Sequence, residues 1–381
     1  RHDVKAVEYL IGEYLEAAAG KLGEGTTLPS LREVIHIFCT SEDINNLAYA
    51  LTIKAATEQV WLPAIRALLD RLRGLAEAGA AVPMLAHTHG QPATPVTIGK
   101  EMAVFAHRLS RQIKRVEATE YLGKINGATG TWAAHVVSVP GADWPTLARS
   151  FVEGLGLTWN PLTTQIESHD WQAELYSDVA RAGRIAHNLA TDAWTYISMD
   201  YFHQNLAAQG STGSSTMPHK VNPIRFENAE ANLEVSNALL DSLASTLVTS
   251  RMQRDLTDST TQRNVGVAFG HAVLAYDNLV RGLDGIEINA ARMARDLDAN
   301  WAVLGEAVQQ AMRAAAIAGA TGMANPYERL KELTRGHEVG ERDMREFIAG
   351  LGLPAEVEER LLALTPATYI GLSERLARWE A

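Results

Sequence analysis

A glycine- and hydroxyl-rich segment from Gly210 to Pro223, with the sequence GSTGSSTMPHKVNP, holds the most unusual set of reactive groups in the chain. Three consecutive hydroxyls starting at Ser214 are followed by Lys220, whose charge can reach an anion that the segment closes over. The patterns of a hydrolase nucleophile elbow and of a phosphate-binding P-loop are both absent from it. Its apolar residues are unusual for a solvated linker, so we interpret the segment as a functional lid rather than a plain helix connection.

Two histidines, His87 and His89, lie in the proline-bounded segment Ala86–Pro95, which we expect to form a loop just before a long helix. Histidine is the side chain best suited to donate a proton near neutral pH. A metal site would need more ligands than these two, and no nearby Cys, Asp or Glu completes a set, so we expect no metal. A hydrogen-bonded structural histidine remains the alternative.

The segment Thr40–Asn46 brings hydroxyls and free backbone N–H groups to a predicted helix N-terminus, where a carboxylate can bind. We expect Ser41 to be the N-cap, with Glu42 and Asp43 in the first turn, where the helix dipole favours negative charge. Ordinary helix capping is the alternative explanation for this pattern.

The segment from residue 250 to residue 263 contains Arg254 and Arg263, which could hold phosphate or carboxylate groups through bidentate contacts. The alternative is a turn in which these arginines form salt bridges with Asp255 and Asp258. Together with the preceding segments, the two arginines would provide donors for several negative charges.

Long helices must position these segments, because apolar residues recur at three- and four-residue steps over most of the chain. The predicted helices are Ser41–Gly79, kinked at Pro63, then Ile98–Val116, Trp171–Ile197, Arg225–Val248 and Asn264–Gly282. Alternating strand patterns are nearly absent, and the short His135–Val139 is one of few candidates. The fold class is therefore predicted to be all-α.

Three domains are expected along the 381 residues. Because helix-like sequence begins immediately after Arg1, residues 1–40 are expected to be the remnant of an N-terminal helical domain whose start is missing. Residues 41–282 would form the central long-helix domain. The composition changes after Gly282, and shorter helical stretches at Pro326–Thr334 and Pro354–Leu364 predict a C-terminal helical domain over residues 283–381.

The overall charge disfavours several classes of partner. With 34 Lys and Arg against 45 Asp and Glu, the net charge is −11, and no basic tract could neutralise a run of phosphates, so nucleic-acid binding is not expected. No apolar run approaches the roughly 20 residues of a membrane-spanning helix, so no membrane association is expected. The single cysteine, Cys39, excludes an internal disulfide and fits a reducing compartment, with the cytoplasm as the expected location.

The same segments, taken together, resemble the signature motifs of the fumarase/aspartase superfamily. The motifs are HDVKAV from His2, CTSEDINN from Cys39, THGQPATP from Thr88, TTQIE from Thr163, GSSTMPHKVNP from Gly213, QRDLTDST from Gln253 and LKELTRG from Leu330. With histidine at position 219, this motif resembles the adenylosuccinate lyase version, whereas fumarases usually have Gly at this position and argininosuccinate lyases have Gln. The resemblance covers essentially the whole chain and is greatest to the bacterial purine-pathway type of adenylosuccinate lyase.

This resemblance implies an all-α, fumarase/aspartase-like subunit with a long central helix bundle and smaller helical N- and C-terminal domains. It also implies a homotetramer in which three chains build each active site, and a β-elimination that needs no metal and no organic cofactor. The small-molecule substrates would be adenylosuccinate, giving AMP and fumarate, and succinylaminoimidazole carboxamide ribotide (SAICAR), giving its carboxamide (AICAR) and fumarate.

The resemblance also assigns roles to individual residues. Ser214 would be the general base that removes the Cβ proton, His89 the general acid that protonates the departing nitrogen, and Lys220 and Asn222 would stabilise the developing negative charge. The full set of expected substrate-binding positions is His2, Asp3, Thr40, Ser41, Gln165, Ser215, Lys220, Val221, Asn222, Asn228, Arg254, Ser259, Thr260, Thr261, Gln262 and Arg263.

Two alternatives stay open at this point. One is an argininosuccinate-type lyase of the same superfamily, against which His219 and the QRDLTDST motif weigh. The other is a catalytically silent helical oligomer with a structural role. The presence of Ser214, His89 and Lys220 together argues against the silent role, because a structural chain has no need of all three.

Overall fold

The computed structural model describes residues 3–23, 25–205, 217, 220–334 and 339–378 of the chain. These residues are mostly helical, as predicted, and they divide into two compact units. Unit 1 comprises residues 1–65, 112–184 and 232–274, and unit 2 comprises residues 66–111, 185–231 and 275–381. Several long helices contribute residues to both units. The two predicted domain boundaries, after residues 40 and 282, remain predictions.

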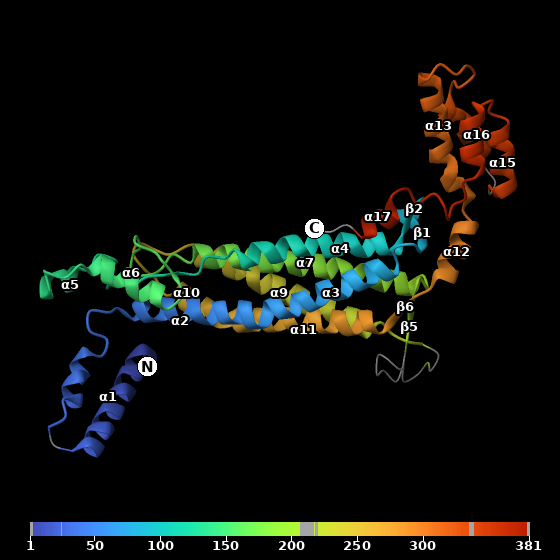
Figure 1. Cartoon of the computed structure of the whole chain (residues 1–381). Coiled ribbons are helices and arrows are strands. Elements are labelled where there is room, and N and C mark those ends of the chain that lie inside the picture. The colour runs from blue at the N-terminus through green and yellow to red at the C-terminus, as the bar shows by residue number, and fades with distance from the viewer. Residues whose placement is uncertain (1–2, 24, 206–216, 218–219, 335–338, 379–381) are drawn as a thin grey trace. The chain divides into compact units, whose positions relative to one another are not determined.

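Unit 1 contains the first helices and the middle of the chain. It includes α1 (Asp3–Leu22), the 3-10 helix η1 (Leu28–Val34), α2 (Ser41–Ala56), β3 (Leu122–Gly123), α5 (Ala133–Ser138), α6 (Trp144–Gly154), β4 (Thr158–Trp159), α10 (Thr257–Thr261) and η3 (Gln262–Asn264), with parts of α7 (Asp170–Ser198), α9 (Ile224–Leu247) and α11 (Val265–Asp284). Strands β3 and β4 pair in parallel, and α1 lies beside η1 (Figure 1).

Unit 2 contains two short antiparallel sheets among helices. It includes most of α3 (Leu62–Ala78) and α4 (Ile98–Glu117), the β1 (Pro83–Thr88) and β2 (Gln91–Thr97) hairpin, and the β5 (Phe202–Gln204) and β6 (Ile286–Ile288) pair. The C-terminal part adds α12 (Ala290–Asp298), η4 (Trp301–Leu304), α13 (Gly305–Ile317), α14 (Pro326–Thr334), α15 (Glu341–Ala349), α16 (Ala355–Leu362) and α17 (Ser373–Ala377). In Figure 1 the hairpin lies beside α12 and α17.

The predicted long helices are confirmed, and the disturbance at Pro63 takes the form of a π turn. The five residues Thr57–Trp61 between α2 and α3 adopt π-helical hydrogen bonding. Proline has no N–H, and its ring collides with the carbonyl four residues earlier, here that of Gln59. One wider turn immediately before Pro63 relieves this conflict without ending the helical run.

Three local expectations were wrong. Ala86–Pro95 lies within the β1–β2 hairpin rather than in an irregular loop, because a two-residue turn at His89 and Gly90 lets the flanking strands pair. The strand candidate His135–Val139 is mostly helical, lying in and just after α5, where the Val139 N–H donates to the His135 carbonyl. The N-cap of α2 is Thr40, so Ser41 is already the first helical residue.

The hairpin is fixed at its base by a close approach of two glycines. The Gly99 N–H donates to the Gly79 carbonyl at 3.0 Å. A Cβ on Gly99 would lie 2.3 Å from the Ala76 carbonyl oxygen, so only glycine allows this approach. The end of α3 and the start of α4 are therefore held together, and the hairpin projects from that junction.

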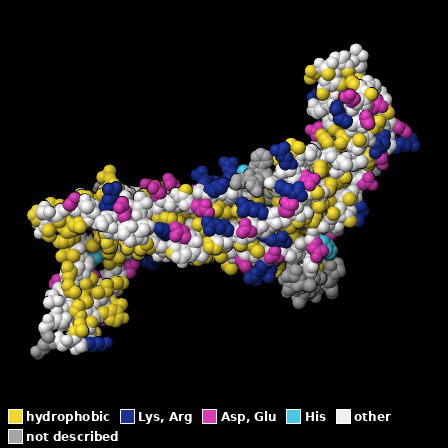
Figure 2. Space-filling model, in the orientation of Figure 1, with side chains coloured by type: hydrophobic (Ala, Val, Ile, Leu, Met, Phe, Trp, Pro, Cys, Tyr) yellow, Lys and Arg dark blue, Asp and Glu magenta, His cyan; other side chains and the backbone are white. Residues whose placement is uncertain are grey.

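Helix α1 exposes an unusual number of apolar side chains. Val7, Leu10, Ile11 and Tyr14 are all exposed, and Figure 2 shows hydrophobic side chains gathered over this helix. Exposed apolar faces of this kind commonly mark surfaces that bind another protein. Among the described residues, no helix combines the length and apolar character needed to cross a membrane.

Candidate active site

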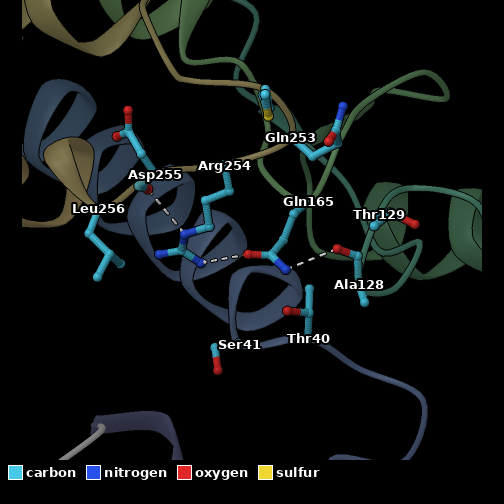
Figure 3. Close-up of a pocket in the computed structure, with 10 residues that line it drawn as sticks. Thr40, Ser41, Ala128, Thr129, Gln165, Gln253, Arg254, Asp255 and Leu256 are labelled. Atoms are coloured by element: carbon cyan, nitrogen blue, oxygen red, sulfur yellow. Dashed lines mark hydrogen bonds between the residues drawn. The ribbon is translucent and has the colours of Figure 1, made fainter.

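A pocket of about 600 Å³ in unit 1 brings together three of the segments that the sequence singled out (Figure 3). Its lining residues are Thr40, Ser41, Ala128, Thr129, Gln165, Met252, Gln253, Arg254, Asp255 and Leu256. Thr40 and Ser41 stand at the start of α2, while Gln165 and Arg254 come from two loops far apart in sequence. The predicted meeting of Thr40, Ser41, Gln165 and Arg254 is thus found within one unit.

Arg254 is the cation of this pocket, and protein groups hold it from three sides. Its Nη1 donates to Gln165 Oε1 at 3.4 Å, its Nε donates to the Asp255 backbone carbonyl at 3.3 Å, and its Nη2 lies 2.9 Å from Glu42 Oε1. Gln165 in turn donates through Nε2 to the Ala128 carbonyl at 2.9 Å (Figure 3). The guanidinium is therefore held in one orientation at the pocket wall.

The salt-bridged turn considered as the alternative for the arginines takes a different form. Asp255 pairs with Arg251 at 3.0 Å, and Asp258 lies 3.4 Å from His169 Nε2, so neither carboxylate neutralises Arg254 directly. Burial alone would raise the pKa of Asp258, but the hydrogen bond and charge of His169 leave it below its ordinary value. Arg254 pairs instead with Glu42, a residue more than two hundred positions away.

Beneath the pocket, Asp43 is a buried centre that sequence reasoning missed. Its carboxylate forms an ion pair with Lys124 at 2.8 Å, and both side chains are 0% exposed. It also accepts backbone N–H groups of Thr40, Asn126 and Gly127 at 2.9–3.0 Å. Burial lowers the pKa of Lys124, while the Asp43 carboxylate acts in the opposite direction. Asp43 thus ties the start of α2 to the loop that carries the opposite wall.

The single cysteine lies beside this centre. Cys39 directly precedes Thr40, and its side chain is partly buried. Burial raises the pKa of its thiol to about 11, the Asp43 carboxylate acts in the same direction, and Lys124 opposes both. The thiol is therefore almost entirely protonated at neutral pH.

A second, smaller pocket of about 260 Å³ adjoins the same helix in unit 1. It is lined by Asp3, Glu42, Asn45, Ala48, Tyr49, Thr52, Asp258, Ser259, Gln262 and Arg263. Four predicted binding residues, Asp3, Ser259, Gln262 and Arg263, therefore meet here. Gln262 is 4% exposed, and its Oε1 has no hydrogen-bond partner among the residues that the structure describes. An unpaired buried amide oxygen of this kind is available to a ligand donor.

Other predicted positions lie outside the two pockets. Thr260 and Thr261 lie in α10 but line neither pocket, and the Thr261 hydroxyl donates to the Thr257 carbonyl of its own helix. In unit 2, Lys220 and Asn228 are exposed, and Gln204 donates to the Val221 carbonyl at 2.8 Å, just before the half-buried Asn222. The predicted His2, Ser214 and Ser215, and with them His219, lie outside the described residues.

His89 lies at the tip of the β1–β2 hairpin in unit 2 and has a rare backbone conformation. Its φ is 53° and that of Gly90 is 74°, so both central residues of the two-residue turn have positive φ. Such turns usually carry Asn or Asp at the first position, and a histidine there is strained. Backbone strain of this kind concentrates at functional sites, and this geometry presents an exposed imidazole.

The hairpin is also tied to the C-terminal part of unit 2. Thr94 in β2 donates its hydroxyl to Glu306 Oε2, and Tyr369 donates to the same oxygen at 3.2 Å. Burial and the Glu306 carboxylate raise the pKa of Tyr369, which keeps its hydroxyl a donor. Among the described residues, no group of three or more His, Cys, Asp or Glu side chains is arranged to hold a metal ion.

Comparison with known proteins places this geometry in a family. The family model described as "Lyase" matches residues 1–237, and that described as "Adenylosuccinate lyase C-terminal" matches residues 250–370. The chain is 50% identical over 370 residues to the adenylosuccinate lyase of Escherichia coli strain K12, covering 97% of this chain and 78% of that one. It is 49% identical over 376 residues to the adenylosuccinate lyase of Vibrio cholerae, covering 98% of this chain and 79% of that one.

Solved structures support the fold independently of the close relatives. The 3-carboxy-cis,cis-muconate lactonizing enzyme from Pseudomonas putida superposes with a TM-score of 0.75 at 22% identity, covering 98% of this chain and 79% of that one. A fumarate lyase from Mesorhizobium superposes with a TM-score of 0.76 at 21% identity, covering 98% of this chain and 83% of that one. These structures share the fold of this chain, and the match to the lyase family model over residues 1–237 places it among the lyases of the fumarase/aspartase superfamily. Within it, the chain belongs to the adenylosuccinate lyase family, as the motifs predicted.

Proposed function

We propose that this protein is an adenylosuccinate lyase of purine nucleotide synthesis, which eliminates fumarate from adenylosuccinate to give AMP and from SAICAR to give AICAR. The observation that carries the proposal is 50% identity over 97% of the chain to an enzyme of that name. At this level of identity, a pocket with the motif residues Thr40, Ser41, Gln165 and Arg254 on its walls supports the same chemistry.

In the proposed reaction, Ser214 removes a proton from Cβ of the succinyl group. The electron pair left on Cβ forms the double bond of fumarate, the C–N bond breaks, and His89 donates a proton to the departing nitrogen. Lys220 and Asn222 stabilise the negative charge that builds up on the neighbouring carboxylate. The exposed position of His89 on a strained turn supports its role as the acid.

Substrate binding is proposed to use the remaining positions predicted from the motifs. Pockets for small molecules are usually about 300–1,000 Å³ and contain a few fixed polar groups. The larger pocket falls in this range, and Arg254 offers it a planar fork of donors suited to a carboxylate or a phosphate. We therefore assign oxyanion binding to this pocket, with Thr40, Ser41 and Gln165 as further contacts.

We also propose that the protein works as a cytoplasmic homotetramer with shared active sites, without a metal or organic cofactor and without nucleic-acid or membrane partners. The exposed apolar face of α1 supports association with further copies. The single cysteine supports a reducing compartment.

A direct assay tests this function. Adenylosuccinate, SAICAR and argininosuccinate would each be incubated separately with the purified protein, while substrate absorbance and fumarate release are followed. Argininosuccinate represents the alternative lyase activity. We expect turnover of the first two, and loss of at least about a thousandfold in kcat for Ser214→Ala and for His89→Ala. Release of fumarate from argininosuccinate, but from neither adenylosuccinate nor SAICAR, would overturn the assignment. Near-normal kcat in either variant would overturn the acid and base roles.

A further inference from the structure

Glu42 is the least exposed of the charged residues that line the two pockets, and no role in binding follows from its motif alone. Its side chain is 5% exposed, and its Oε1 lies 2.9 Å from Arg254 Nη2. Asn45 donates to the same oxygen at 2.9 Å. Glu42 lines the smaller pocket while Arg254 lines the larger one. The ion pair therefore forms part of the wall between them.

The arginine depends on this carboxylate more than on its other partners. Its side chain is only 17% exposed, and a charge at that depth needs a partner. Its other two contacts, at 3.3 and 3.4 Å, are long hydrogen bonds to uncharged acceptors. A guanidinium has five N–H groups, so N–H groups on its terminal nitrogens remain for a ligand once Glu42 and Gln165 have fixed its plane.

We propose that Glu42 is a positioning residue, which fixes the plane of the Arg254 guanidinium so that its remaining N–H groups meet an oxyanion of the substrate. The inference rests on the proposed function for the identity of that substrate, whose oxyanions are a phosphate and two carboxylates. In this proposal Glu42 acts through Arg254 rather than by contacting that oxyanion.

The sign of one measurement separates this role from simple electrostatics. Glu42 carries a negative charge next to an anion-binding pocket, so its removal alone would strengthen the attraction for an anion. If orientation matters more than charge, Glu42→Gln, which keeps the shape but loses the charge, will weaken anion binding instead. If Glu42 had a purely structural role, Glu42→Gln would change thermal stability without either strengthening or weakening anion binding.

The experiment measures binding by calorimetry with two probes and turnover in parallel. AMP carries the phosphate and fumarate the two carboxylates, so the weakened probe identifies which oxyanion Arg254 holds. We expect Glu42→Gln to weaken one of them about tenfold and to raise KM for adenylosuccinate about tenfold, with kcat changed less than about threefold. Glu153→Gln is the matched control, because Glu153 pairs with Arg149 on the exposed surface of the same unit.

A double-mutant cycle completes the test. In an Arg254→Lys background, the additional change Glu42→Gln is expected to cost less than about twofold, because the residue through which Glu42 acts has already been altered. Unchanged or tighter binding of both probes by Glu42→Gln would overturn the proposal, as would equal effects in both backgrounds. Because the calorimetry needs no turnover, a wild-type protein that binds these probes but releases no fumarate would overturn the proposed function and leave this inference standing.

Discussion

At the scale of single residues, the pocket is organised by acidic groups that hold its cations and loops in place. The motif predicted a binding role for Arg254, and the structure places this residue on the wall of the larger pocket, so the binding role stays a prediction. The partners Glu42 and Lys124 were not predicted, because each pairs with a residue distant in sequence. The local sequence shows only that Glu42 and Asp43 lie in the first turn of a helix, and ordinary helix capping explains that pattern equally well. Only the tertiary fold shows that both are buried.

The Asp43–Lys124 pair gives a stability prediction. Lys124→Met is expected to lower the free energy of unfolding by about 3 kcal/mol, because it leaves the Asp43 carboxylate buried without its counter-charge. The double replacement Asp43→Asn with Lys124→Met should cost less than the sum of the two single changes. Urea unfolding at one fixed protein concentration measures this, since association shifts apparent stability.

Arg149→Met provides the comparison for that measurement, because Arg149 belongs to an exposed pair whose loss costs at most about 1 kcal/mol. Equal losses for Lys124→Met and Arg149→Met would show that the buried pair contributes no more than a surface one.

At the scale of elements, the helices were predictable and the hairpin was not. Apolar residues spaced at three and four positions predicted α4, α7, α9 and α11 to within about two residues at each end. The hairpin strands contain prolines and a histidine at the turn, and all of these are poor strand signals. Pairing prevails because the close contact at Gly79 and Gly99 fixes both ends of the segment, and because Glu306 holds Thr94.

The turn at the hairpin tip gives a prediction about catalysis. Gly90→Ala is expected to destabilise the turn by about 1 kcal/mol, because its φ of 74° is costly for any residue with a Cβ. A displaced His89 should then lower kcat by about tenfold or more, while KM changes little. Steady-state kinetics with adenylosuccinate measure both constants.

Gly141→Ala serves as the control for the hairpin variant, since a Cβ there meets open space and the backbone has no positive φ. A Gly90→Ala enzyme with the kcat of this control would show that the turn does not position the acid.

At the scale of the whole molecule, the working unit is proposed to be larger than one chain. The sequence suggested this only through the family resemblance, since no periodicity or composition reports how many copies assemble. The exposed apolar side chains of α1 are the feature of the described residues that agrees with it. Such a face became recognisable only when the fold showed which side of the helix stays uncovered.

Shared active sites predict that two inactive proteins can restore each other. Ser214→Ala and His89→Ala variants, dissociated together and reassembled in equal amounts, are expected to regain about one quarter of wild-type activity, because random mixing gives that share of sites both intact residues when different chains supply them. Fumarate release measures the recovery, and gel filtration confirms assembly. If the mixture stays as inactive as its components, each site takes both residues from one chain.

The environment of Cys39 has a practical consequence for labelling the protein. With a pKa of about 11, this thiol has roughly one hundredth of the thiolate of an ordinary cysteine at neutral pH. It is also the only cysteine in the sequence. A cysteine introduced elsewhere on the surface would therefore react far faster with a maleimide dye, so single-site fluorescent labelling should succeed without first removing the native thiol.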